Sequence, residues 1–389
     1  MSGAQPGRPN VLLVHPYRLG TAGLTTFVLG LQKGLRAQGC GALVLVGGDS
    51  SRVTVQDEAA QIYQVYLRRV WPETGRLRAL VAFWVRLPIT LLHLWQFLRR
   101  ERIDVVHLHF TNPASLYFAV LRPLSGWRLI TTFHGTDAYS LPRRTPWHRF
   151  LVRLVIGAAD ALTTVSADLL LAVKAAYPRL RTPARVILNG SLVTDAPSTA
   201  APPPGLPDRY ALAVGSLIPR KAYDVLVRAL RLVRDRGRDL HLVIVGGGPE
   251  DTALVSLAQE LGISDRVVLA GEMPHAAALG FYAGARFFVH SAREEAFGLV
   301  MLEAMSFGKA VIAARVGGIP EFVRDGVTGL LVEADDPEAL AEAMATLDAD
   351  EALRAKLGAA GREAASTEHS WDRVVERYRG LYEDVLRRP

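Results

Sequence analysis

The stretch SAREEAFGLVMLEAM, residues 291–305, joins a strand to a helix in a way that decides the fold. The apolar run before it, Ala285 to Val289, predicts a buried strand, and the polar residues that follow predict a turn. A helix is expected to begin near Phe297-Gly298 and to end at about Phe307. The first amides of such a helix have no intrahelical partner, so they can hold an anion such as a diphosphate.

Two carboxylates flank this helix start, because Glu295 falls in the loop and Glu303 falls one to two turns inside the helix. A carboxylate accepts hydrogen bonds from hydroxyl groups. The segment therefore suits a ligand that is anionic in its middle and hydroxylated at both ends, and a sugar nucleotide has this chemistry. The alternative is an ordinary strand–loop–helix unit with two solvated glutamates.

The same residues resemble the signature of the retaining family 4 glycosyltransferases. That signature is Glu-x7-Glu, with Phe-Gly just after the first Glu and Glu-Ala-Met at the second, and here it reads Glu295, Phe297-Gly298 and Glu303-Ala304-Met305. The resemblance implies the GT-B architecture, in which two doubly wound Rossmann-like domains face a central cleft. It also implies a nucleotide-sugar donor, transfer of a hexose, and retention of the anomeric configuration.

Strands and helices alternate along both halves of the chain, which predicts α/β domains built on parallel sheets. In the first half, strands are expected at residues 11–14, 42–46, 104–109, 129–133, 161–165 and 185–188, with a helix at residues 25–38. In the second half, strands are expected at residues 210–214, 241–245, 267–270, 285–289, 310–313 and 329–332. Between the halves, residues 196–207 contain five prolines and are expected to form a linker.

The sequence thus predicts an N-terminal domain, residues 1–195, and a C-terminal domain, residues 208–370. The resemblance implies that the first binds the acceptor and the second binds the nucleotide sugar. The final helix, residues 371–386, has one apolar face to bury. In the GT-B architecture, this last helix packs back on the N-terminal domain.

The segment AVGSLIPRKA, residues 213–222, follows the first strand of the second half. Its glycine turn, Gly215-Ser216, and its two cations, Arg220 and Lys221, suit a diphosphate, because Arg offers a planar fork and Lys a point charge. The family often has Arg after the first Gly and Gly after the Lys. Here those positions hold Ser216 and Ala222, so Arg220 is expected to replace the missing cation. The alternative is a solvated turn with surface cations.

Three further turns follow strands of the second half. The turn VGGGPE, residues 245–250, contains Gly248 and resembles the family's Gly-x-Gly-Pro pattern, although most such turns favour glycine for structural reasons. The turn GEMP contains Met273 and lies where the family holds the nucleotide base. The turn VGGIPE, residues 316–321, either shapes the donor pocket or is plain turn chemistry.

Two motifs of the first half resemble family positions. Gly23 lies in Ala22-Gly23-Leu24-Thr25, where the family usually has Gly-Gly at the loop where donor and acceptor meet, so Ala22 departs from the pattern. His134 ends a strand in TFHGTD, residues 132–137, and is expected to contact the transferred sugar or its acceptor. A buried, hydrogen-bonded structural histidine is the alternative. His107 and His109 alternate on a strand, and His109 is expected to be a core residue, with the cleft face as the alternative.

The net charge of +7 is concentrated in residues 67–102, which contain eight arginines and two acids and so a surplus of six. The same residues contain Trp71, Trp84 and Trp95, and no clean apolar run is long enough to span a membrane. A basic segment with tryptophans can lie on a membrane surface. The alternative is two core helices, separated near Pro88, whose arginines extend to solvent, and nucleic-acid binding is not expected.

No metal and no cofactor are predicted. Asp348-Ala349-Asp350 has suitable spacing for a metal, but it is expected to be a solvated pair at the end of a surface helix. The single cysteine, Cys40, excludes a disulfide within the chain. Because residues 1–10 lack a basic-then-apolar signal pattern, we expect a cytoplasmic protein, with peripheral association at the inner face of the cell membrane.

The sequence and the resemblance together predict a retaining glycosyltransferase whose acceptor is lipid-linked or a cell-envelope glycan. The expected catalytic residues are Glu295, His134, Lys221 and Arg220. The expected donor-binding residues are Glu303, Gly23, Gly215, Ser216, Gly248, Met273, Ala296, Phe297, Gly298 and Leu299. The alternatives are a sugar-nucleotide isomerase, which would need no acceptor, and a non-catalytic binding partner that keeps the fold.

Overall fold

The computed structural model describes residues 8–18, 23–67, 77–124, 126–191, 193 and 201–388, and for residues 77–84 it describes only the backbone. The chain divides into two compact units. Unit 1 comprises residues 1–188 and 374–389, and unit 2 comprises residues 189–373. The predicted linker, residues 196–207, lies partly outside the described residues, and its described part belongs to unit 2.

Unit 1 is built on an eight-stranded sheet with the order β3-β4-β2-β1-β5-β6-β7-β8. All of its paired strands run parallel except β3, which pairs antiparallel with β4 at the edge. The central strands are buried along their whole length, because they are short apolar runs covered on both faces. The strands are β1 (Asn10–His15), β2 (Gly41–Gly47), β3 (Thr54–Asp57), β4 (Ile62–Val65), β5 (Val105–His109), β6 (Arg128–Phe133), β7 (Ala161–Thr164) and β8 (Ala184–Val186).

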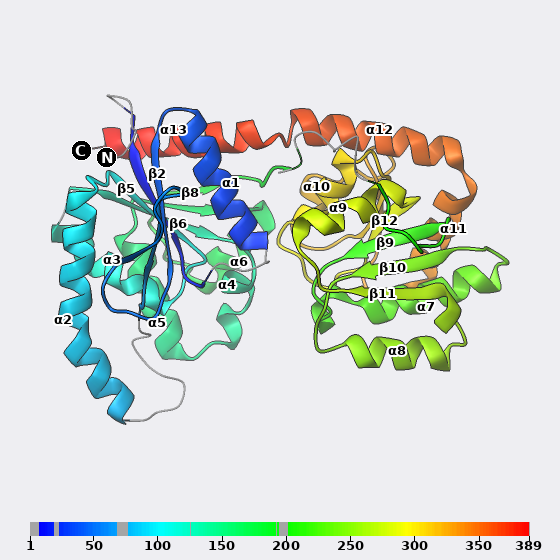
Figure 1. The fold of residues 1–389 in the computed structure, drawn as a ribbon, viewed down its shortest axis with the longest axis horizontal. Coiled ribbons are helices and arrows are strands. Elements are labelled where there is room, and N and C mark those ends of the chain that lie inside the picture. Colours follow the sequence, from blue (N-terminus) through cyan, green and yellow to red (C-terminus); the bar gives the residue numbers. More distant parts are fainter. Residues whose placement is uncertain are drawn as a thin grey trace. The chain divides into compact units, whose positions relative to one another are not determined.

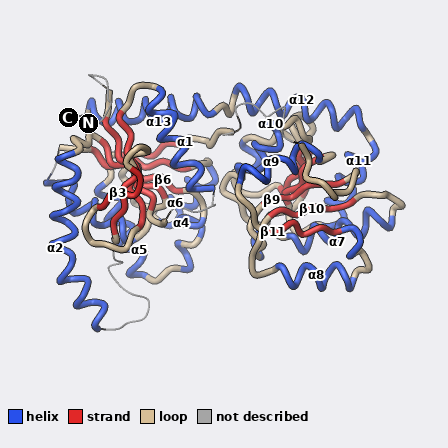
Figure 2. Tube along the Cα trace, viewed as in Figure 1, coloured by secondary structure: helices blue, strands red, loops and turns tan. Residues whose placement is uncertain are grey.

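Helices cover both faces of this sheet (Figure 2). The core on one face joins β1 residues such as Leu12 and Val14 to side chains of α2, α3 and α5. On the other face, His107 of β5 meets Tyr382 of α13, and Phe27 of α1 meets Tyr378 of α13. The helices are α1 (Gly23–Ala37), α2 (Leu77–Arg100), α3 (Leu116–Leu121), α4 (Thr136–Tyr139), α5 (Pro146–Ala158), α6 (Ala167–Ala176) and α13 (Trp371–Arg387).

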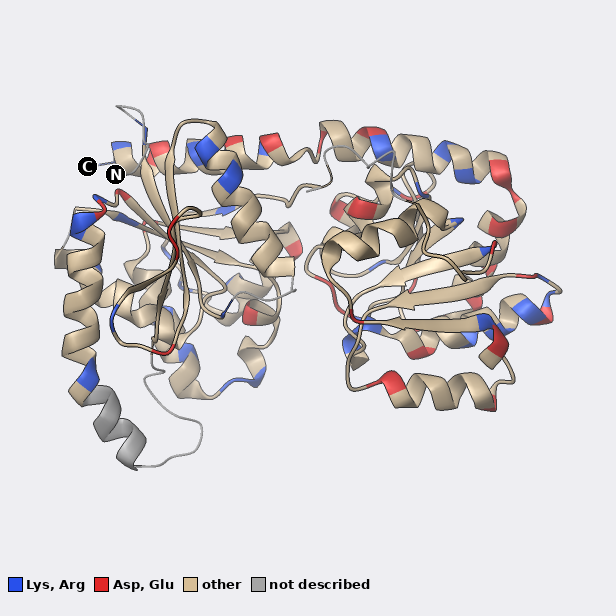
Figure 3. Ribbon diagram, in the orientation of Figure 1, with Lys and Arg blue, Asp and Glu red and all other residues tan. Residues whose placement is uncertain are grey.

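The terminal helix α13 begins in unit 2 and continues into unit 1 at Val374. Its apolar face is buried, and the hydroxyl of Tyr382 lies 2.7 Å from Nδ1 of His107. A Cβ added at Gly34 of α1 would lie 2.4 Å from Cγ2 of Val375, so the glycine allows the two helices to pack closely. Acidic and basic residues both occur along α12 and α13, and their numbers nearly balance in each helix (Figure 3).

Two parts of unit 1 differ from the sequence-based expectations. Strands β3 and β4 were not predicted, because β3 reads TVQD and all four of its residues are exposed. The alternative of two core helices is wrong in their number, since α2 is a single helix of 24 residues that contains Pro88 (Figure 1). Its side chains Leu94, Phe97 and Leu98 do belong to the core. Among the described residues, no helix is both long enough and apolar enough to cross a membrane.

Unit 2 is built on a six-stranded parallel sheet with the order β11-β10-β9-β12-β13-β14. The chain adds strands outward from β9 on one side and then outward from β12 on the other, which is the order of a Rossmann fold. The predicted two-domain α/β architecture is thereby confirmed. The strands are β9 (Tyr210–Val214), β10 (His241–Val245), β11 (Val267–Gly271), β12 (Phe287–His290), β13 (Val311–Ala314) and β14 (Leu330–Val332).

The helices of unit 2 pack on this sheet through apolar side chains. One face meets α7, α8 and α11, and these elements form a single core that includes Leu226, Leu254 and Met344. The helices are α7 (Tyr223–Asp235), α8 (Asp251–Glu260), α9 (His275–Gly284), α10 (Leu299–Ser306), α11 (Pro337–Ala349) and α12 (Glu351–Thr367).

The expected solvated pair Asp348 and Asp350 is corrected by the structure. The side chain of Asp348 is fully buried, and it accepts hydrogen bonds from Arg209 at 2.9 and 3.0 Å and pairs with Arg286 at 3.0 Å. A buried carboxylate requires such partners. Asp350 instead caps α12 by accepting from the amide of Leu353 at 2.8 Å.

Candidate active site

The order of strands in unit 2 reverses between β9 and β12, and ligands of such sheets bind beyond the carboxyl ends of the strands at that point. The loop after β9 contains Gly215, Ser216 and the short 3-10 helix η4 (Pro219–Lys221). The loop after β12 leads from Ser291 to Gly298 and into α10. The two segments that the sequence singled out are therefore neighbours at the switch point.

Lys221, Glu295 and His290 form a buried ionic cluster at this point. The ammonium of Lys221 pairs with Oε2 of Glu295, and Nε2 of His290 lies 3.1 Å from the same oxygen. Burial alone would raise the pKa of Glu295, but the Lys221 charge and the His290 hydrogen bond outweigh it, so this pKa lies well below its ordinary value. Burial and the Lys221 charge lower the pKa of His290. At neutral pH, the cluster is thus an ionised carboxylate held by an ammonium and a neutral imidazole.

Arg293 connects the two loops, although the sequence analysis gave it no role. Its guanidinium donates to both carboxylate oxygens of Asp224 at 3.0 and 2.8 Å, to Asp335, and to the carbonyl of Pro219. Its amide donates to the carbonyl of Arg220 at 2.8 Å. Ser291 adds hydrogen bonds to the carbonyls of Lys221 and Ala222, both at 3.0 Å. These bonds fix η4, which carries the two cations, against the loop that carries Glu295.

Arg220 lies beside Lys221 in η4 and is only partly buried. Its side chain makes no hydrogen bond or ion pair with the residues that the structure describes, whereas Lys221 is paired with Glu295. Ser216 is exposed, and Gly215 has a positive φ of 148°, which favours glycine. The loop after β9 therefore presents one unpaired guanidinium and one exposed hydroxyl.

The start of α10 combines a buried anchor with free amides. Phe297 is buried and stacks on Phe322, with ring centroids 4.5 Å apart, and Ala296 is buried beside it. Gly298 has φ of 93°, and a Cβ there would lie 2.3 Å from the end of Met301 and 3.3 Å from Cγ of Glu295. Leu299 is the first helical residue, and its amide has no partner within the helix. The buried side chain of Phe297 thus positions the turn, and the first amides of α10 are left available to a ligand.

Glu303 lies inside α10 with both oxygens engaged. The hydroxyl of Tyr282 donates to Oε2 at 2.8 Å, and Nε2 of His275 lies 2.8 Å from Oε1. The hydrogen bond to Glu303 raises the pKa of His275. Met273 lies two residues before His275 in the turn after β11 and is partly buried. Each carboxylate oxygen can accept more than one bond, so Glu303 keeps capacity for ligand hydroxyls.

Gly248 has a packing role in the structure. A Cβ at this position would lie 2.4 Å from the carbonyl oxygen of Leu217, so only glycine allows the loops after β9 and β10 to pack. The amide of Leu217 donates to Gly247 at 3.0 Å, and that of Glu250 donates to Leu217 at 3.1 Å. The amide of Gly318, in the third glycine turn, donates to the carbonyl of Glu295 at 3.2 Å. A donor contact at Gly248 stays a prediction.

In unit 1, His134 lies at the carboxyl end of β6 within a group of histidines. Its Nε2 is 3.1 Å from Nδ1 of His109, and its amide donates to Asp137 at 3.0 Å. Burial, together with the nearby His15, lowers the pKa of His134 to about 3. Burial likewise lowers the pKa of His107 and of His109. His109 is buried as expected and additionally orients His134, and His107 is buried too.

The remaining predicted residue of unit 1, Gly23, is the exposed first residue of α1. Its neighbour Ala22 lies outside the described residues. Gly23 and His134 belong to unit 1, whereas all the other predicted site residues belong to unit 2.

A pocket of about 360 Å³ opens at the carboxyl ends of the central strands of unit 1. Asp137, three residues after His134, is one of its lining residues. The sequence did not predict this pocket. Two exposed arginines line it. Arg143 is the last residue of the short 3-10 helix before α5, and Arg144 directly follows that helix. Their signal in the sequence was the short PRR run, which is too common to interpret alone. The polar and aromatic lining includes Tyr17, Asn112, Asp137, Ser140, Trp147 and His148.

Two doubly wound units of this kind are the architecture of the GT-B fold. Residues 200–364 match the family "Glycosyl transferases group 1", and residues 21–191 match "Glycosyltransferase Family 4". The chain belongs to glycosyltransferase family 4 and is a glycosyltransferase.

Relatives with assigned activities support this assignment. The chain is 32% identical over 292 residues to the GDP-mannose-dependent alpha-(1-6)-phosphatidylinositol monomannoside mannosyltransferase of Mycolicibacterium smegmatis, covering 69% of this chain and 73% of that protein. It is 29% identical over 300 residues to N-acetyl-alpha-D-glucosaminyl L-malate synthase of Bacillus anthracis, covering 74% and 77%. It is 40% identical to D-inositol 3-phosphate glycosyltransferase of Acidothermus cellulolyticus over 184 residues, 45% of this chain and 41% of that one.

Solved structures share the fold. Sucrose-phosphate synthase from Thermosynechococcus elongatus matches with a TM-score of 0.77 at 22% identity, covering 97% of this chain and 99% of that one. Anabaena HepE in complex with UDP and glucose matches with a TM-score of 0.72 at 20% identity, covering 97% and 100%. At these identities, the likeness shows the fold alone.

The described residues contain no group of three His, Cys, Asp or Glu side chains that could hold a metal ion. Cys40 is buried and unpaired. Independence from metals and cofactors stays a prediction.

Proposed function

We propose that this glycosyltransferase uses a nucleotide-sugar donor and transfers the sugar, with retention of configuration, to an acceptor hydroxyl. The observation that carries the proposal is the pairing of Glu295 with Lys221 and His290 beside the free amides of α10. The pairing keeps the Glu295 carboxylate ionised, so it accepts hydrogen bonds from sugar hydroxyls. Retention is carried over from the family signature.

The diphosphate is expected to lie against Arg220, Lys221 and the amides from Phe297 to Leu299. The ammonium of Lys221 has three donors, so it can hold a phosphate oxygen while it stays paired with Glu295. As the bond between the sugar and the diphosphate breaks, charge grows on the leaving oxygen. Donors that are already in position stabilise that charge without reorganisation. In this account, protein cations and amides do what a divalent metal does in other enzymes.

The ribose is expected to bind Glu303, whose carboxylate is held in place by Tyr282 and His275. The turn that contains Met273 leads directly to His275, which places the base-binding segment next to the ribose partner. The identity of the nucleotide is open. The smegmatis relative is named as GDP-mannose-dependent, and Anabaena HepE was solved with UDP.

The acceptor is expected to be a hydroxylated anion that binds in the pocket containing Arg143 and Arg144. Arginine pairs of this kind recognise carboxylates and phosphates. The names of the three relatives each contain an acceptor with such a group, namely L-malate, inositol 3-phosphate and a phosphatidylinositol mannoside. His134, held neutral, would contact the transferred sugar or the acceptor hydroxyl at the same strand ends.

A lipid-linked acceptor and binding to a membrane surface are supported by α2. Three of its apolar side chains, Val85, Ile89 and Leu92, are 64%, 48% and 51% exposed and share one helical face. Arg99 and Arg100 are exposed at the end of the helix, where Arg99 lies over the ring of Trp95 at 4.8 Å. Trp71 and Arg76, and the side chains of Trp84 and Arg78, lie outside the described residues. A cytoplasmic location stays a prediction.

The proposal is tested by incubating the enzyme with nucleotide sugars and three acceptor classes: a malate, a sugar phosphate and a glycolipid. Product is analysed by NMR, where the anomeric coupling reports the configuration. Transfer with retention, lost in Glu295→Gln and kept in an Asp350→Asn control, is expected. Conversion of the donor without any acceptor would identify an isomerase instead, and an inverted product would contradict the retaining assignment.

A further inference from the structure

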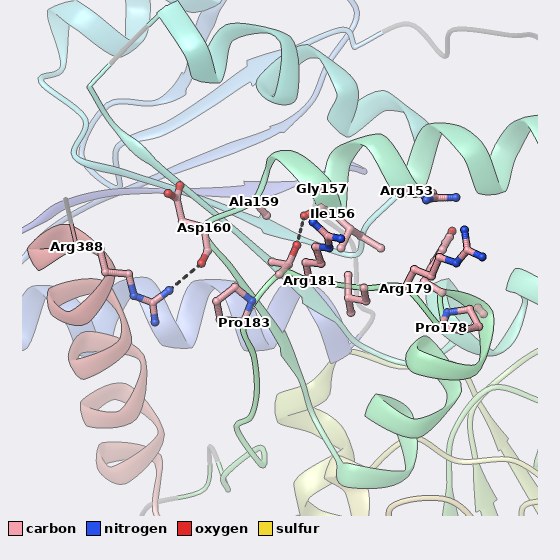
Figure 4. Close-up of a pocket in the computed structure, with 14 residues that line it drawn as sticks. Arg153, Ile156, Gly157, Ala159, Asp160, Pro178, Arg179, Arg181, Pro183 and Arg388 are labelled. Carbon is pink, nitrogen blue, oxygen red and sulfur yellow. Dashed lines mark hydrogen bonds between the residues drawn. The ribbon is translucent and has the colours of Figure 1, made fainter.

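Unit 1 contains a second cavity, which lies away from the pocket beside His134. Its volume is about 840 Å³, and its walls come from the C-terminal half of α5, from residues 176–183, and from Arg388 after α13 (Figure 4). Asp160 and Pro183, which line it, directly precede β7 and β8. The cavity therefore lies at the amino ends of the strands, whereas His134 lies at a carboxyl end. It belongs to neither the donor site nor the acceptor pocket.

Four arginines line this cavity: Arg153, Arg179, Arg181 and Arg388. Figure 4 shows their side chains spread along it, with Arg388 at one end and Arg153 and Arg179 toward the other. Among the described residues, the guanidinium groups of Arg153, Arg179 and Arg181 make no hydrogen bond or ion pair. Arg388 donates only to a neutral partner, the carbonyl oxygen of Asp160, at 3.2 Å.

The single acidic side chain of the lining does not neutralise these cations. Both oxygens of Asp160 already accept hydrogen bonds from Arg122 at 2.9 Å, and Arg128 and the amide of Leu129 add further bonds at 3.3 and 2.8 Å. That carboxylate is therefore committed to two arginines outside the cavity. A concave surface with four cations and no free carboxylate attracts a multiply charged anion.

The remaining residues that line the cavity indicate which class of anion fits it. Ile156, Leu180, Pro178 and Pro183 supply apolar walls between the arginines. The volume is far larger than a phosphate ion needs. On the exposed side of α5 next to Arg153, Phe150 and Leu154 are 47% and 43% exposed. The site thus suits a molecule that carries phosphate groups on a less polar body.

We propose that this cavity is a binding site for a phosphate-bearing ligand, separate from donor and acceptor. Arginine binds phosphate oxygens through two parallel N–H groups, and Arg153, Arg179 and Arg181 have their donors free. The phosphate can come from the head group of an anionic lipid or from a free phosphorylated compound. Both sources share the chemistry that the arginines recognise, and experiment can separate them.

The test uses the full chain and two probes. Inorganic pyrophosphate is titrated by calorimetry in an Arg220→Ala/Lys221→Ala background, which removes both cations of the donor site. Vesicles of phosphatidylcholine with and without phosphatidylglycerol are tested by co-sedimentation. The cavity variant is Arg153→Gln/Arg179→Gln/Arg181→Gln. Its matched control, Arg52→Gln/Arg228→Gln/Arg238→Gln, removes the same charge from exposed arginines elsewhere.

We expect the cavity variant to bind at least one probe about tenfold more weakly than the control, which should stay within about twofold of the parent. Loss with pyrophosphate identifies a free phosphorylated ligand, and loss with the anionic vesicles alone identifies a lipid head group. Binding should weaken as salt is added, because exposed arginines are screened. If neither probe binds, or if both variants bind equally, the proposal is overturned and the arginines are solvated surface cations. Because donor turnover is measured separately, this outcome leaves the proposed enzymatic function intact.

Discussion

The carboxyl edge of the sheet in unit 2 and that of unit 1 both belong to doubly wound units, but the groups that they carry differ in charge. In unit 2, Glu295 is ionised and held by Lys221, with Arg220 unpaired beside them. In unit 1, His107, His109 and His134 are held in their neutral forms by burial. One edge therefore carries fixed charge, and the other carries neutral hydrogen-bonding groups.

The difference separates two chemical tasks. A leaving diphosphate needs fixed positive charge close to the breaking bond. An acceptor hydroxyl or a sugar needs neutral donors and acceptors whose positions are fixed, and a histidine held by His109 and by Asp137 supplies one. In unit 1, the cations lie farther along, at Arg143 and Arg144, where the proposed function places an anionic group of the acceptor.

The largest effect is expected when the charge in unit 2 is removed. In Lys221→Ala, the buried carboxylate of Glu295 loses its ammonium, and the diphosphate loses a donor. We expect kcat/KM to fall at least 100-fold, about 3 kcal/mol of transition-state stabilisation. Lys356→Ala, an exposed lysine on α12, is the matched control. An equal fall in kcat/KM in both variants would show that the charge at the carboxyl edge of unit 2 has no special role, and it would contradict the comparison of the two edges.

A smaller effect is expected at Glu303, which contacts the ribose in this account. Loss of hydrogen bonds to a charged group is worth about 1.5–3 kcal/mol, so Glu303→Ala should weaken donor binding about 10- to 100-fold. Tyr282→Phe removes only the hydroxyl that holds Glu303 and should cost less than fivefold. Calorimetry with the nucleoside diphosphate measures both. A larger loss in Tyr282→Phe than in Glu303→Ala would contradict the assignment.

Lowering the pH is expected to destabilise unit 1 more than unit 2, because the two units differ in the pKa values of their buried histidines. A histidine whose folded pKa is lowered binds fewer protons than in the unfolded chain, so its unit loses stability as pH falls below about 6.5. His134, with a pKa of about 3, alone should remove about 1 kcal/mol from unit 1 at pH 5.5, and the lowered pKa values of His15, His107 and His109 act in the same direction. Asp137, whose pKa is raised to about 7 by burial, opposes them, because the folded unit takes up a proton there that the unfolded chain does not. In unit 2, His290 acts in the same direction, but His275, whose pKa is raised, acts in the opposite one.

Hydrogen exchange followed by mass spectrometry at pH 7.5 and 5.5 resolves the two units in one experiment. We expect protection in the strands of unit 1 to fall first, and His134→Gln to reduce that fall. The lowered pKa of Glu295 gives unit 2 stability that is lost only as pH falls below about 4.5. Simultaneous loss in both units at pH 5.5 would show that the histidines do not distinguish them.

The smallest effect is expected at Arg293, which positions the loops of unit 2 without touching the ligand in this account. Arg293→Lys keeps the charge but cannot hold both oxygens of Asp224 together with Pro219. We expect kcat to fall about two- to fivefold, with donor KM almost unchanged. Added guanidinium is not expected to restore kcat. A fall in kcat/KM as large as that of Lys221→Ala would instead identify Arg293 as a ligand-binding residue.

The sequence was sufficient for the parts of the site that depend on strand order. Lys221 and Glu295 lie 74 residues apart, yet both follow strands that are neighbours in a doubly wound sheet, so their meeting could be anticipated. The buried strands were found within one or two residues, because short apolar runs that are bounded by turn residues favour strands over longer helices. The start of α10 was likewise placed correctly by Phe297-Gly298.

The partners of these residues could not be predicted, because nothing local marks them. His290 and Tyr282 are parts of apolar runs, and only the three-dimensional packing turns them toward Glu295 and Glu303. Asp348 was taken for a solvated residue because its arginines, Arg209 and Arg286, lie far away in the sequence. The exposed edge strand β3 and the pocket beside Arg143 were missed because their sequences are polar and common.

The most direct test of the account is calorimetric binding of UDP, GDP, ADP, dTDP and CMP, and of their sugars, to the parent protein, to Lys221→Ala and to Glu303→Ala. We predict that one nucleotide family binds the parent protein and that both variants weaken it at least tenfold, with Asp350→Asn unchanged. Binding that persists in both variants would place the donor away from the switch point of unit 2 and would contradict the account.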